Sequence, residues 1–360
     1  MLIEPRDPLI VRDGRPFTNS PGARAKSLPF PLPQTLAGAY RTRRALLEGL
    51  PLPERAEEVL RWGLRGPLLA EEGEGGWRLL APRPLDALKL GEALYPLRPL
   101  ELPQGAGTNL PEGLSPVGLP SPALKEKPAP LPAFWYWESF LEWLLQDAPA
   151  GFAPRGHEGP VPETRTHVAL DPAAQTAREG FLFQTSGLEF VRGRRRLALV
   201  LWPEGPEPEG VFPLGGERRL AFWQKGGPGD PPLPEEGVGL LRHRAARLVF
   251  LTPAFLGEAY LPKGRAFQGA SVVAAVVGRP VAVSGWNLKE GKPKPSRRAV
   301  PAGSVYFVRF PEAWGEGEVR DWAGKVWFQN LSEEEQDRRD GFGLAALGLW
   351  DGKLRRWEEA

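Results

Sequence analysis

The chain has 360 residues, and its 46 Lys and Arg against 44 Asp and Glu give a formal net charge of +2. This balance excludes a uniformly basic nucleic-acid coat protein but leaves room for a local basic groove. The absence of cysteine excludes disulfides, thiol catalysis and cysteine-ligated metal sites.

The remaining composition indicates a folded protein with many stiff loops. Gly (43) and Pro (42) together reach about twice the usual share, yet 13 tryptophans and a 41% hydrophobic content supply enough apolar surface for a core. Of the basic residues 35 are arginine, the residue that favours planar contacts with phosphate or carboxylate. Scarce Met and abundant Pro, Glu and Arg are typical of thermophiles. The start at Met1–Asp7 lacks a signal-peptide pattern and no apolar run suffices for a membrane span, so we expect a cytoplasmic protein without a membrane partner.

The first half of the chain predicts a strand, a helix, a hairpin and an aromatic helix. Thr35 is the expected N-cap of the first helix. Residues 96–133 are punctuated by proline and are expected to be loop. The ranges are Leu2–Val11 for the strand, Leu36–Glu48 for the helix, Leu64–Leu69 with Trp77–Pro82 for the hairpin, and Phe134–Leu145 for the aromatic helix.

Strands dominate the second half. Their expected ranges are His167–Leu170, Phe181–Gln184, Leu188–Val191, Leu197–Trp202, Gly215–Trp223, Arg247–Phe255, Ser271–Val277, Val281–Ser284, Ser304–Phe310 and Leu344–Trp350. The first two are joined by residues 171–180. Because the βαβ spacing of parallel sheets is missing, the pattern predicts an α+β protein with antiparallel sheets. Residues 226–237 form a Pro/Gly-rich spacer, so the expected domains are 1–235 and 236–360.

Two clusters of basic residues are candidate RNA contacts. The first follows the initial strand and continues onto the helix: Arg12, Arg15, Arg24, Lys26, Arg41, Arg43 and Arg44. Such charges could track phosphates, or form ordinary solvated surface. The second holds one aromatic residue and five cations: Trp286, Lys289, Lys292, Lys294, Arg297 and Arg298. Here a base could stack on the indole while the cations hold phosphates; the alternative is a flexible basic loop.

Catalytic chemistry has little support in the sequence. The histidines are His157, His167 and His243, far apart and without metal-ligand spacing, and no Walker-type loop or G-x-S-x-G elbow occurs. His167 could be a ribonuclease acid or base, a satisfied strand histidine or a polar RNA contact. Near the C-terminus, Gly341–Gly343 has too little chain after it for a dinucleotide fingerprint. Its glycines predict a close backbone approach, to another segment or to a ligand.

Several strings together resemble a known family. They are Ile3–Leu9, Arg12–Phe17, Pro33–Ala39, Thr166–Asp171, Gly180–Phe183, Gly215–Arg218, Ser284–Trp286, Pro301–Phe307 and Gly341–Gly343. This set resembles the RAMP-superfamily subunit of type III-B CRISPR effector (Cmr) complexes that caps the 5′ tag of the guide RNA (crRNA). The matches are spread over nearly the whole chain, and the Arg12–Phe17 string is among the most specific.

The resemblance implies two ferredoxin-like (RRM-like) domains with β-hairpin insertions. It implies binding of the repeat-derived 5′ tag of the crRNA for antiviral defence. The implied protein partners are the large polymerase-like subunit and the first backbone RAMP subunit. The resemblance also implies indirect contact with target RNA through a β-hairpin "thumb", for which Thr164–Phe183 is the candidate. RNA cleavage, DNA cleavage and cyclic oligoadenylate synthesis are implied for other subunits, so we expect no catalytic residue, metal or cofactor here.

The expected RNA-binding residues come from three parts of the chain and the hairpin. They are Arg12, Arg15, Lys26, Ser27, Thr35, Arg41, Arg44, His167, Trp286, Lys289, Lys294, Arg297, Arg298, Gly341, Phe342 and Gly343. Two alternatives to tag binding stay open. A RAMP endoribonuclease that matures guide RNA would cleave repeat RNA through His167. A protein-only scaffold would keep its RNA affinity after charge reversal at Arg12, Arg15 and Arg41.

Overall fold

The computed structural model describes residues 1–11, 24–25, 27–119, 127–146, 151–234, 243–287 and 289–356. The chain forms two compact units, each built from three chain segments. Unit 1 comprises Met1–Trp77, Gly159–Gly227 and Ala282–Arg297, and unit 2 comprises Arg78–Glu158, Pro228–Val281 and Arg298–Ala360. The units are therefore interleaved in sequence, whereas the expected domains 1–235 and 236–360 are sequential; that division stays a prediction.

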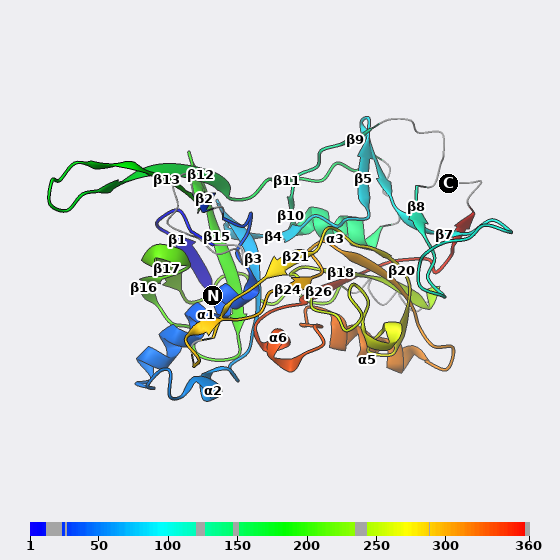
Figure 1. The fold of residues 1–360 in the computed structure, drawn as a ribbon. Coiled ribbons are helices and arrows are strands. Elements are labelled where there is room, and N and C mark those ends of the chain that lie inside the picture. Colours follow the sequence, from blue (N-terminus) through cyan, green and yellow to red (C-terminus); the bar gives the residue numbers. More distant parts are fainter. Residues whose placement is uncertain are drawn as a thin grey trace. The chain divides into compact units, whose positions relative to one another are not determined.

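Unit 1 contains an antiparallel sheet with the strand order β3-β15-β1-β17-β16 (Figure 1). The strands are β1 (Leu2–Pro5), β3 (Leu64–Gly73), β15 (Arg195–Pro203), β16 (Gly210–Pro213) and β17 (Leu220–Gln224), and β14 (Val191–Arg192) pairs with β15. A one-turn 3₁₀ helix, η1 (Gly216–Arg218), precedes β17. The first strand ends at Pro5, six residues earlier than expected, because Pro5 and Pro8 lack the N–H that a ladder needs.

Helix α1 (Pro33–Leu47) supplies the main helical layer of unit 1 and is followed by the short α2 (Ala56–Val59). Its buried positions include Leu36, Ala37 and Tyr40, spaced as one helix face. The prediction that Thr35 caps the helix is wrong. Pro33 occupies the first turn, where its missing N–H is not needed, so the helix begins two residues before Thr35.

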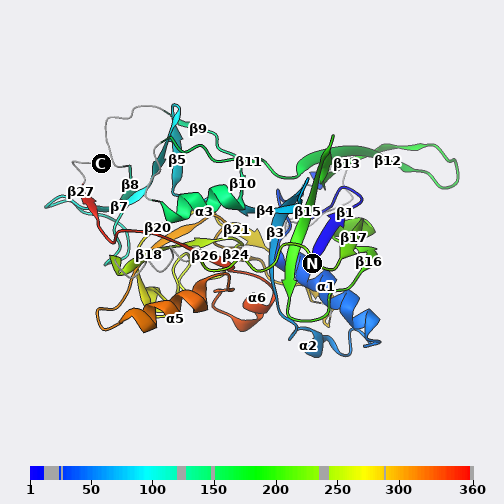
Figure 2. The same ribbon diagram turned by 180° about the vertical axis from the view of Figure 1, so that it is seen from behind.

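A long hairpin belongs to unit 1 and extends away from its sheet (Figures 1 and 2). Strands β12 (Val161–Leu170) and β13 (Ala177–Glu189) pair antiparallel, and β2 (Arg24–Ala25) pairs parallel with β13. The two predicted strands at 167–170 and 181–184 are confirmed, but the hairpin is longer on both sides. At its tip, Asp171 Oδ1 accepts the N–H groups of Ala173 and Ala174 at 2.8 and 3.1 Å.

Unit 2 contains a second antiparallel sheet with the order β19-β20-β25-β18-β26. The strands are β18 (Ala245–Phe250), β19 (Ala266–Phe267), β20 (Ala270–Val276), β25 (Val305–Arg309) and β26 (Ala345–Gly348). The helices of this unit are α3 (Trp137–Leu145), α5 (Glu316–Val326) and α6 (Glu335–Arg339), with the 3₁₀ turn η3 at Lys263–Arg265.

Smaller strands complete the chain. In unit 2 they are β5 (Ala87–Leu90), β6 (Ala93–Pro96), β7 (Arg98–Glu101), β8 (Val117–Gly118), β9 (Pro128–Ala129), β10 (Phe134–Tyr136), β11 (Gly156–His157) and β27 (Arg355–Arg356). Unit 1 has β22 (Trp286–Asn287) and β23 (Lys292–Pro293), and the chain passes between units within β4 (Gly76–Pro82), β21 (Val281–Val283) and β24 (Arg297–Ala299).

Two expectations for residues 96–145 are only partly confirmed. Residues 96–133 contain the paired strands β7, β8 and β9 rather than loop alone. The aromatic segment begins as a strand, because Phe134 pairs with Pro82 and His157, and the helix starts only at Trp137. Consecutive aromatic residues fit a pleated surface as well as a helix, which explains the error.

The two main sheets share one strand order. In unit 1 it runs β3-β15-β1-β17 and in unit 2 it runs β20-β25-β18-β26, so each time the first strand lies between the third and the fourth. A helix, α1, follows the first strand in unit 1, and α5 precedes the last strand in unit 2. The α+β class with antiparallel sheets is confirmed. Among the described residues, no helix is both long and apolar enough to cross a membrane.

Candidate nucleic-acid interface

Unit 1 contains a groove of about 930 Å³, here called the α1 groove. Four parts of unit 1 contribute to its walls: the chain at Ile10 and Val11, one face of α1, β16 with the turn that follows it, and the β22–β23 hairpin. Its lining residues are Ile10, Val11, Thr35, Gly38, Ala39, Thr42, Arg43, Leu46, Phe212, Pro213, Gly215, Gly216, Glu217 and Trp286. Two predicted site residues, Thr35 and Trp286, thus lie in one groove although 251 positions separate them.

Trp286 supplies an open aromatic surface. Its side chain is 60% exposed, which is unusual for a tryptophan in a folded chain. The segment before it is fixed to α1, since Gln34 Nε2 donates to the carbonyl oxygen of Ser284. The turn after it is closed by Asn287, whose Oδ1 accepts the N–H groups of Lys289 and Glu290 at 3.1 and 3.2 Å. The backbone is therefore held on both sides of Trp286, while its ring is exposed.

Arg43 and Phe212 form a second stacking surface in the same groove. The Arg43 guanidinium carbon lies 3.5 Å from the centroid of the Phe212 ring, a cation–π contact. Behind it, Phe212 makes an edge contact with the buried Trp223 at 6.1 Å. Arg43 Nε is shielded from solvent and has no hydrogen-bond partner among the described residues. A planar cation on an aromatic ring is a platform for an unpaired base.

A glycine turn brings the backbone of residues 215–216 against the end of the first chain segment. Gly215 has φ +74°, and a Cβ there would lie 2.7 Å from the carbonyl oxygen of Ile10. The N–H of Gly216 donates to that same oxygen at 2.6 Å. Only glycine fits this approach, so the turn forms the floor of the α1 groove without side chains filling it.

The first predicted cluster is divided by the structure. Arg12, Arg15 and Lys26 lie outside the described residues. Ser27 is buried at the hairpin, where its Oγ donates to the Ser186 carbonyl and accepts the Val11 N–H at 3.3 Å. Its hydroxyl thus has an internal structural role.

Arg41 and Arg44 contact unit 1 itself. Arg41 is 5% exposed, and its Nε and Nη2 donate to the Trp62 carbonyl at 3.0 and 2.9 Å. Arg44 lies over the Trp62 ring at 3.9 Å and pairs with Glu48 at 2.7 Å. Both guanidinium groups hold α1 against the segment after α2, which leaves Arg43 as the arginine of α1 that lines the groove.

The second cluster remains mostly at the surface. Lys289 Nζ lies 2.7 Å from Glu57 Oε1, with both side chains exposed, and the hydrogen bond to Glu57 raises the pKa of Lys289. Lys292 pairs with Glu290 at 3.1 Å. Lys294 is exposed directly after β23, where its N–H donates to the Gly285 carbonyl at 2.7 Å, and Arg297 ends that segment of unit 1. Arg298 is exposed and belongs to unit 2.

The Gly341–Gly343 turn lies in the interior of unit 2. Phe342 is 1% exposed and packs on Phe255 with ring centroids 4.8 Å apart. Gly343 has φ +82°, and a Cβ there would meet the Ser332 nitrogen at 2.6 Å. Thr252 Oγ1 donates to the Gly341 carbonyl at 2.8 Å. Of the two expected close approaches, the one to another chain segment accounts for these glycines.

His167 lies on β12, where its Nε2 is 2.9 Å from the Thr185 hydroxyl on the paired strand. His157 and His243 belong to unit 2. Within the described ranges, no three His, Asp or Glu side chains are grouped so that they could hold a metal ion.

Arg43 belongs to the first basic cluster but not to the expected RNA-binding residues, and Phe212, Gly215 and Gly216 were not expected to line a groove. A signal for Arg43 was present, because Thr35, Ala39, Thr42 and Leu46 recur at the three- and four-residue spacing of one helix face and Arg43 adjoins it. For Phe212, nothing local in the sequence indicates a partner on α1.

Comparisons with known proteins place the chain in a family. A protein-family model described as CRISPR-associated protein (Cas_Cmr3) matches residues 1–350. A search of curated proteins finds no match. A chain in the cryo-EM structure of the type III-B Cmr-beta bound to cognate target RNA and AMPPnP, state 1, is 14% identical with a TM-score of 0.53, covering 100% of this chain and 99% of that one.

A chain in the cryo-EM structure of the type III-B Cmr-beta bound to cognate target RNA is 17% identical with a TM-score of 0.49, covering 85% of each chain. At these identities the structural comparison with the first of the two chains shows a common fold. The family match extends over nearly the whole chain, in agreement with the resemblance of its motifs, and the chain therefore belongs to the Cas_Cmr3 family of CRISPR-associated proteins, subunits of the type III-B Cmr complex.

Proposed function

We propose that this protein is a non-catalytic RNA-binding subunit that caps the repeat-derived 5′ tag of the crRNA. In the cytoplasm it would bridge the large polymerase-like subunit to the backbone RAMP subunits of the effector complex, for antiviral defence. The observation that carries the proposal is the α1 groove, which combines the exposed Trp286 with the Arg43–Phe212 stack. Family membership supplies the type of ligand.

The chemistry of the groove suits splayed single-stranded RNA. A volume of about 930 Å³ is at the upper end of small-ligand pockets, enough for nucleotide-sized groups. Base–aromatic stacking contributes about 1–3 kcal/mol per base and accepts any base. Hydrogen bonds to base edges then supply selection for a fixed tag, and Thr35 and Thr42 in the groove wall offer hydroxyls for this purpose.

The β12–β13 hairpin is the proposed thumb that reaches the guide–target duplex. Three apolar side chains are exposed along it: Val168 (44%), Leu170 (63%) and Leu182 (57%). Apolar side chains can insert between base steps, and exposing them to water has no evident benefit for the free chain. Target RNA would thus be met by the hairpin, while the tag is held by the groove.

We further propose that the two main sheets are ferredoxin-like domains. The βαββαβ pattern of that fold has two helices, and each unit here retains one of them beside the shared strand order: α1 in unit 1 and α5 in unit 2.

A binding measurement tests tag recognition. Fluorescence anisotropy would compare the affinity of the assembled complex for guide RNA with the native tag and with a scrambled tag. Trp286→Ala should weaken binding of the native tag by roughly 10-fold, as expected for one lost stack, and Trp286→Phe should restore most of it. Leu47→Ala removes an equally exposed apolar side chain of α1 outside the groove lining and should have no effect. Equal affinities for both tags in the unmodified protein would contradict the proposal.

A further inference from the structure

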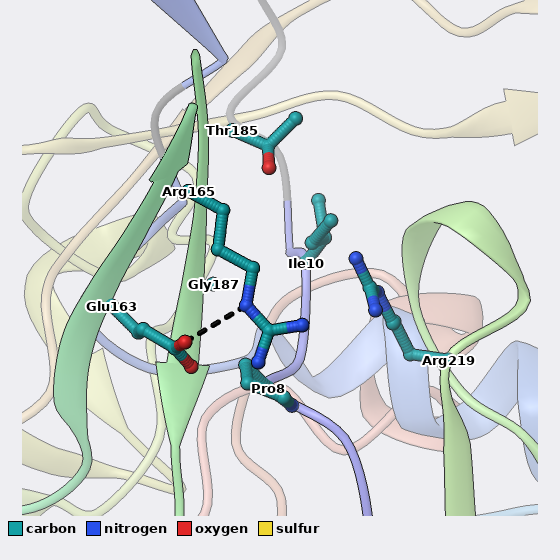
Figure 3. Close-up of a pocket in the computed structure, with 7 residues that line it drawn as sticks. All are labelled: Pro8, Ile10, Glu163, Arg165, Thr185, Gly187 and Arg219. Atoms are coloured by element: carbon teal, nitrogen blue, oxygen red, sulfur yellow. Dashed lines mark hydrogen bonds and ion pairs between the residues drawn. The ribbon is translucent and has the colours of Figure 1, made fainter. Parts of the chain in front are cut away.

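A second, much smaller pocket lies where the β12–β13 hairpin leaves the sheet of unit 1, here called the root pocket (Figure 3). Its lining residues are Pro8, Ile10, Glu163, Arg165, Thr185, Gly187 and Arg219. Arg165 pairs with Thr185 across the hairpin, and Glu163 pairs with Gly187. A Cβ at Gly187 would lie 2.8 Å from Pro8 Cβ, so glycine allows the chain before Ile10 to pass close to the hairpin.

Arg219 brings unused hydrogen-bonding capacity to this pocket. Its side chain is 19% exposed, and its Nε is sealed from solvent without a hydrogen-bond partner among the described residues. Arg219 Nη2 forms a long ion pair with Glu217 at 3.9 Å, a distance too great for a hydrogen bond. A shielded guanidinium N–H without an acceptor is unfavourable, and an oxygen atom of a ligand would relieve this.

Arg165 approaches the same space from the hairpin. Its Nε is held by Glu163 Oε1 at 2.8 Å, which fixes the plane of the guanidinium. Figure 3 shows the guanidinium groups of Arg165 and Arg219 directed toward the space around Ile10. Two further acids act electrostatically on Arg165 while they accept backbone N–H groups: Asp7 accepts that of Leu220 at 3.0 Å and Glu189 that of Val191 at 2.9 Å.

The size of the root pocket selects the ligand. Its volume is about 10 Å³, room for about one water-sized group and far too little for a base or sugar. A phosphate can insert a single oxygen while its others accept N–H groups from two arginine forks at the rim. A neutral ligand oxygen could accept the Arg219 Nε–H, but only an anion would also gain from the two guanidinium charges, so the combination of charge and size favours a phosphate.

We propose that Arg165 and Arg219 together bind one phosphodiester group of the crRNA at the root of the hairpin. The inference rests on the proposed function, because it takes the RNA to be the ligand of unit 1. The inference adds a site that anchors the RNA backbone at the root pocket, between the α1 groove and the proposed thumb. Glu163 is then a competitor: it neutralises Arg165 in the free protein and must give way in part when the phosphate binds.

The test combines protein variants with a scan of the RNA backbone. Each guide RNA of a series carries a single neutral methylphosphonate linkage, placed at a different position of the tag or the adjoining guide. The affinity of every RNA is measured for complexes that contain the unmodified chain or one of the variants Arg165→Ala, Arg219→Ala and Glu163→Gln. We expect one linkage whose neutralisation weakens the unmodified complex roughly 10-fold but leaves both arginine variants unchanged, the sign of a shared contact. In the two arginine variants, the slope of the logarithm of the binding constant against the logarithm of the salt concentration should become shallower by about 0.7, as expected for one lost phosphate contact to single-stranded RNA.

Glu163→Gln should change RNA affinity in the opposite direction from the arginine variants. If a phosphate competes for Arg165, this variant binds unmodified RNA several-fold more tightly; if the Glu163–Arg165 pair is only structural, affinity stays equal or falls. Arg192→Ala, an exposed arginine of β14, is the matched control, and Arg219→Lys tests the need for the planar fork. A methylphosphonate profile unchanged in both arginine variants overturns the phosphate site while leaving tag binding intact. Loss of tag preference in the unmodified protein overturns both.

Discussion

Arg247 and Asp86 form an ion pair in the interior of unit 2, with Nη1 2.6 Å from Oδ2 and side chains 1% and 0% exposed. Arg247 Nε donates to the Leu349 carbonyl at 2.8 Å and Nη2 to the Trp143 carbonyl at 2.7 Å. The Trp143 indole N–H donates to Asp86 Oδ1 at 2.9 Å. The pair therefore joins β18, the last turn of α3 and the chain after β26 into one network.

Removing either member of this pair should be strongly destabilising. Without Asp86, the buried Arg247 and Arg98 both lose their carboxylate, and without Arg247, Asp86 keeps only the longer contact with Arg98 Nη1 at 4.0 Å. We expect Asp86→Ala and Arg247→Met each to lower the free energy of unfolding by about 3–5 kcal/mol, measured by denaturant unfolding. The double variant Asp86→Leu/Arg247→Met should recover part of the loss. The exposed pair of Lys225 and Glu209 at 2.9 Å is the control, and Glu209→Gln should leave stability unchanged. Equal, small losses in all variants would contradict the account.

Two glycines with the same backbone conformation should respond differently to alanine. Gly343 has φ +82° and Gly105 has φ +81°, but a Cβ at Gly105 meets open space, whereas one at Gly343 meets the Ser332 nitrogen at 2.6 Å. Gly105→Ala should lower the free energy of unfolding by about 1 kcal/mol from backbone strain alone. Gly343→Ala should lose about 1–3 kcal/mol more from the clash. Thermal unfolding of both proteins decides the matter, and similar losses would be evidence against the packed turn.

The tip of the proposed thumb should be sensitive to pH. Hydrogen bonds from the N–H groups of Ala174 and Ala173 lower the pKa of Asp171 from its usual value. Since the folded pKa is depressed, the stabilisation is complete above the unfolded value and is lost as pH falls through the folded value. Amide NMR shifts of Ala173 and Ala174 should follow this titration, and Asp171→Asn should abolish it while keeping the turn. A midpoint at or above the ordinary Asp value would refute the prediction.

The non-catalytic assignment predicts that the purified chain leaves repeat RNA intact. His167 should act as a polar residue of the hairpin, hydrogen-bonded to Thr185, so His167→Ala should change the gel pattern of incubated repeat RNA no more than Thr166→Ala does. Defined cleavage products that disappear only in His167→Ala would instead establish the endoribonuclease alternative.

Local patterns predicted much of the fold. Leu197–Trp202 is a short continuous apolar run, and the apolar segments on either side of residues 171–180 flank a polar turn; both patterns indicate strands without distant information. They are present as β15 and β12–β13. The assignment of residues 78–158 to the second unit could not be predicted, because it depends on contacts with strands more than a hundred positions later. Phe134–Tyr136 forms a strand because it pairs with β4 and β11, which lie tens of residues before and after it in the sequence.

The site was harder to predict than the fold. Sequence spacing favoured Arg41 and Arg44, but both guanidinium groups contact Trp62, which no local signal indicates. Arg43 adjoins the helix face that contributes Thr35 and Leu46 to the groove, so helical periodicity could have favoured it. Trp286 was predicted because an aromatic residue among cations is a recognisable combination. The phosphate site at Arg165 and Arg219 depends on three-dimensional proximity alone.

Photo-crosslinking in the reconstituted complex tests the central claim most directly. One guide RNA would carry a single 4-thiouridine in the 5′ tag and another would carry it within the guide, and crosslinked peptides of this chain would be identified by mass spectrometry. Tag binding predicts crosslinks from the tag to peptides that contain Thr35–Leu46 or Trp286. In the Trp286→Ala variant, the crosslinks to the peptide that contains position 286 should be lost. Crosslinks from the guide alone, or none to this chain, would contradict tag capping and favour the scaffold alternative.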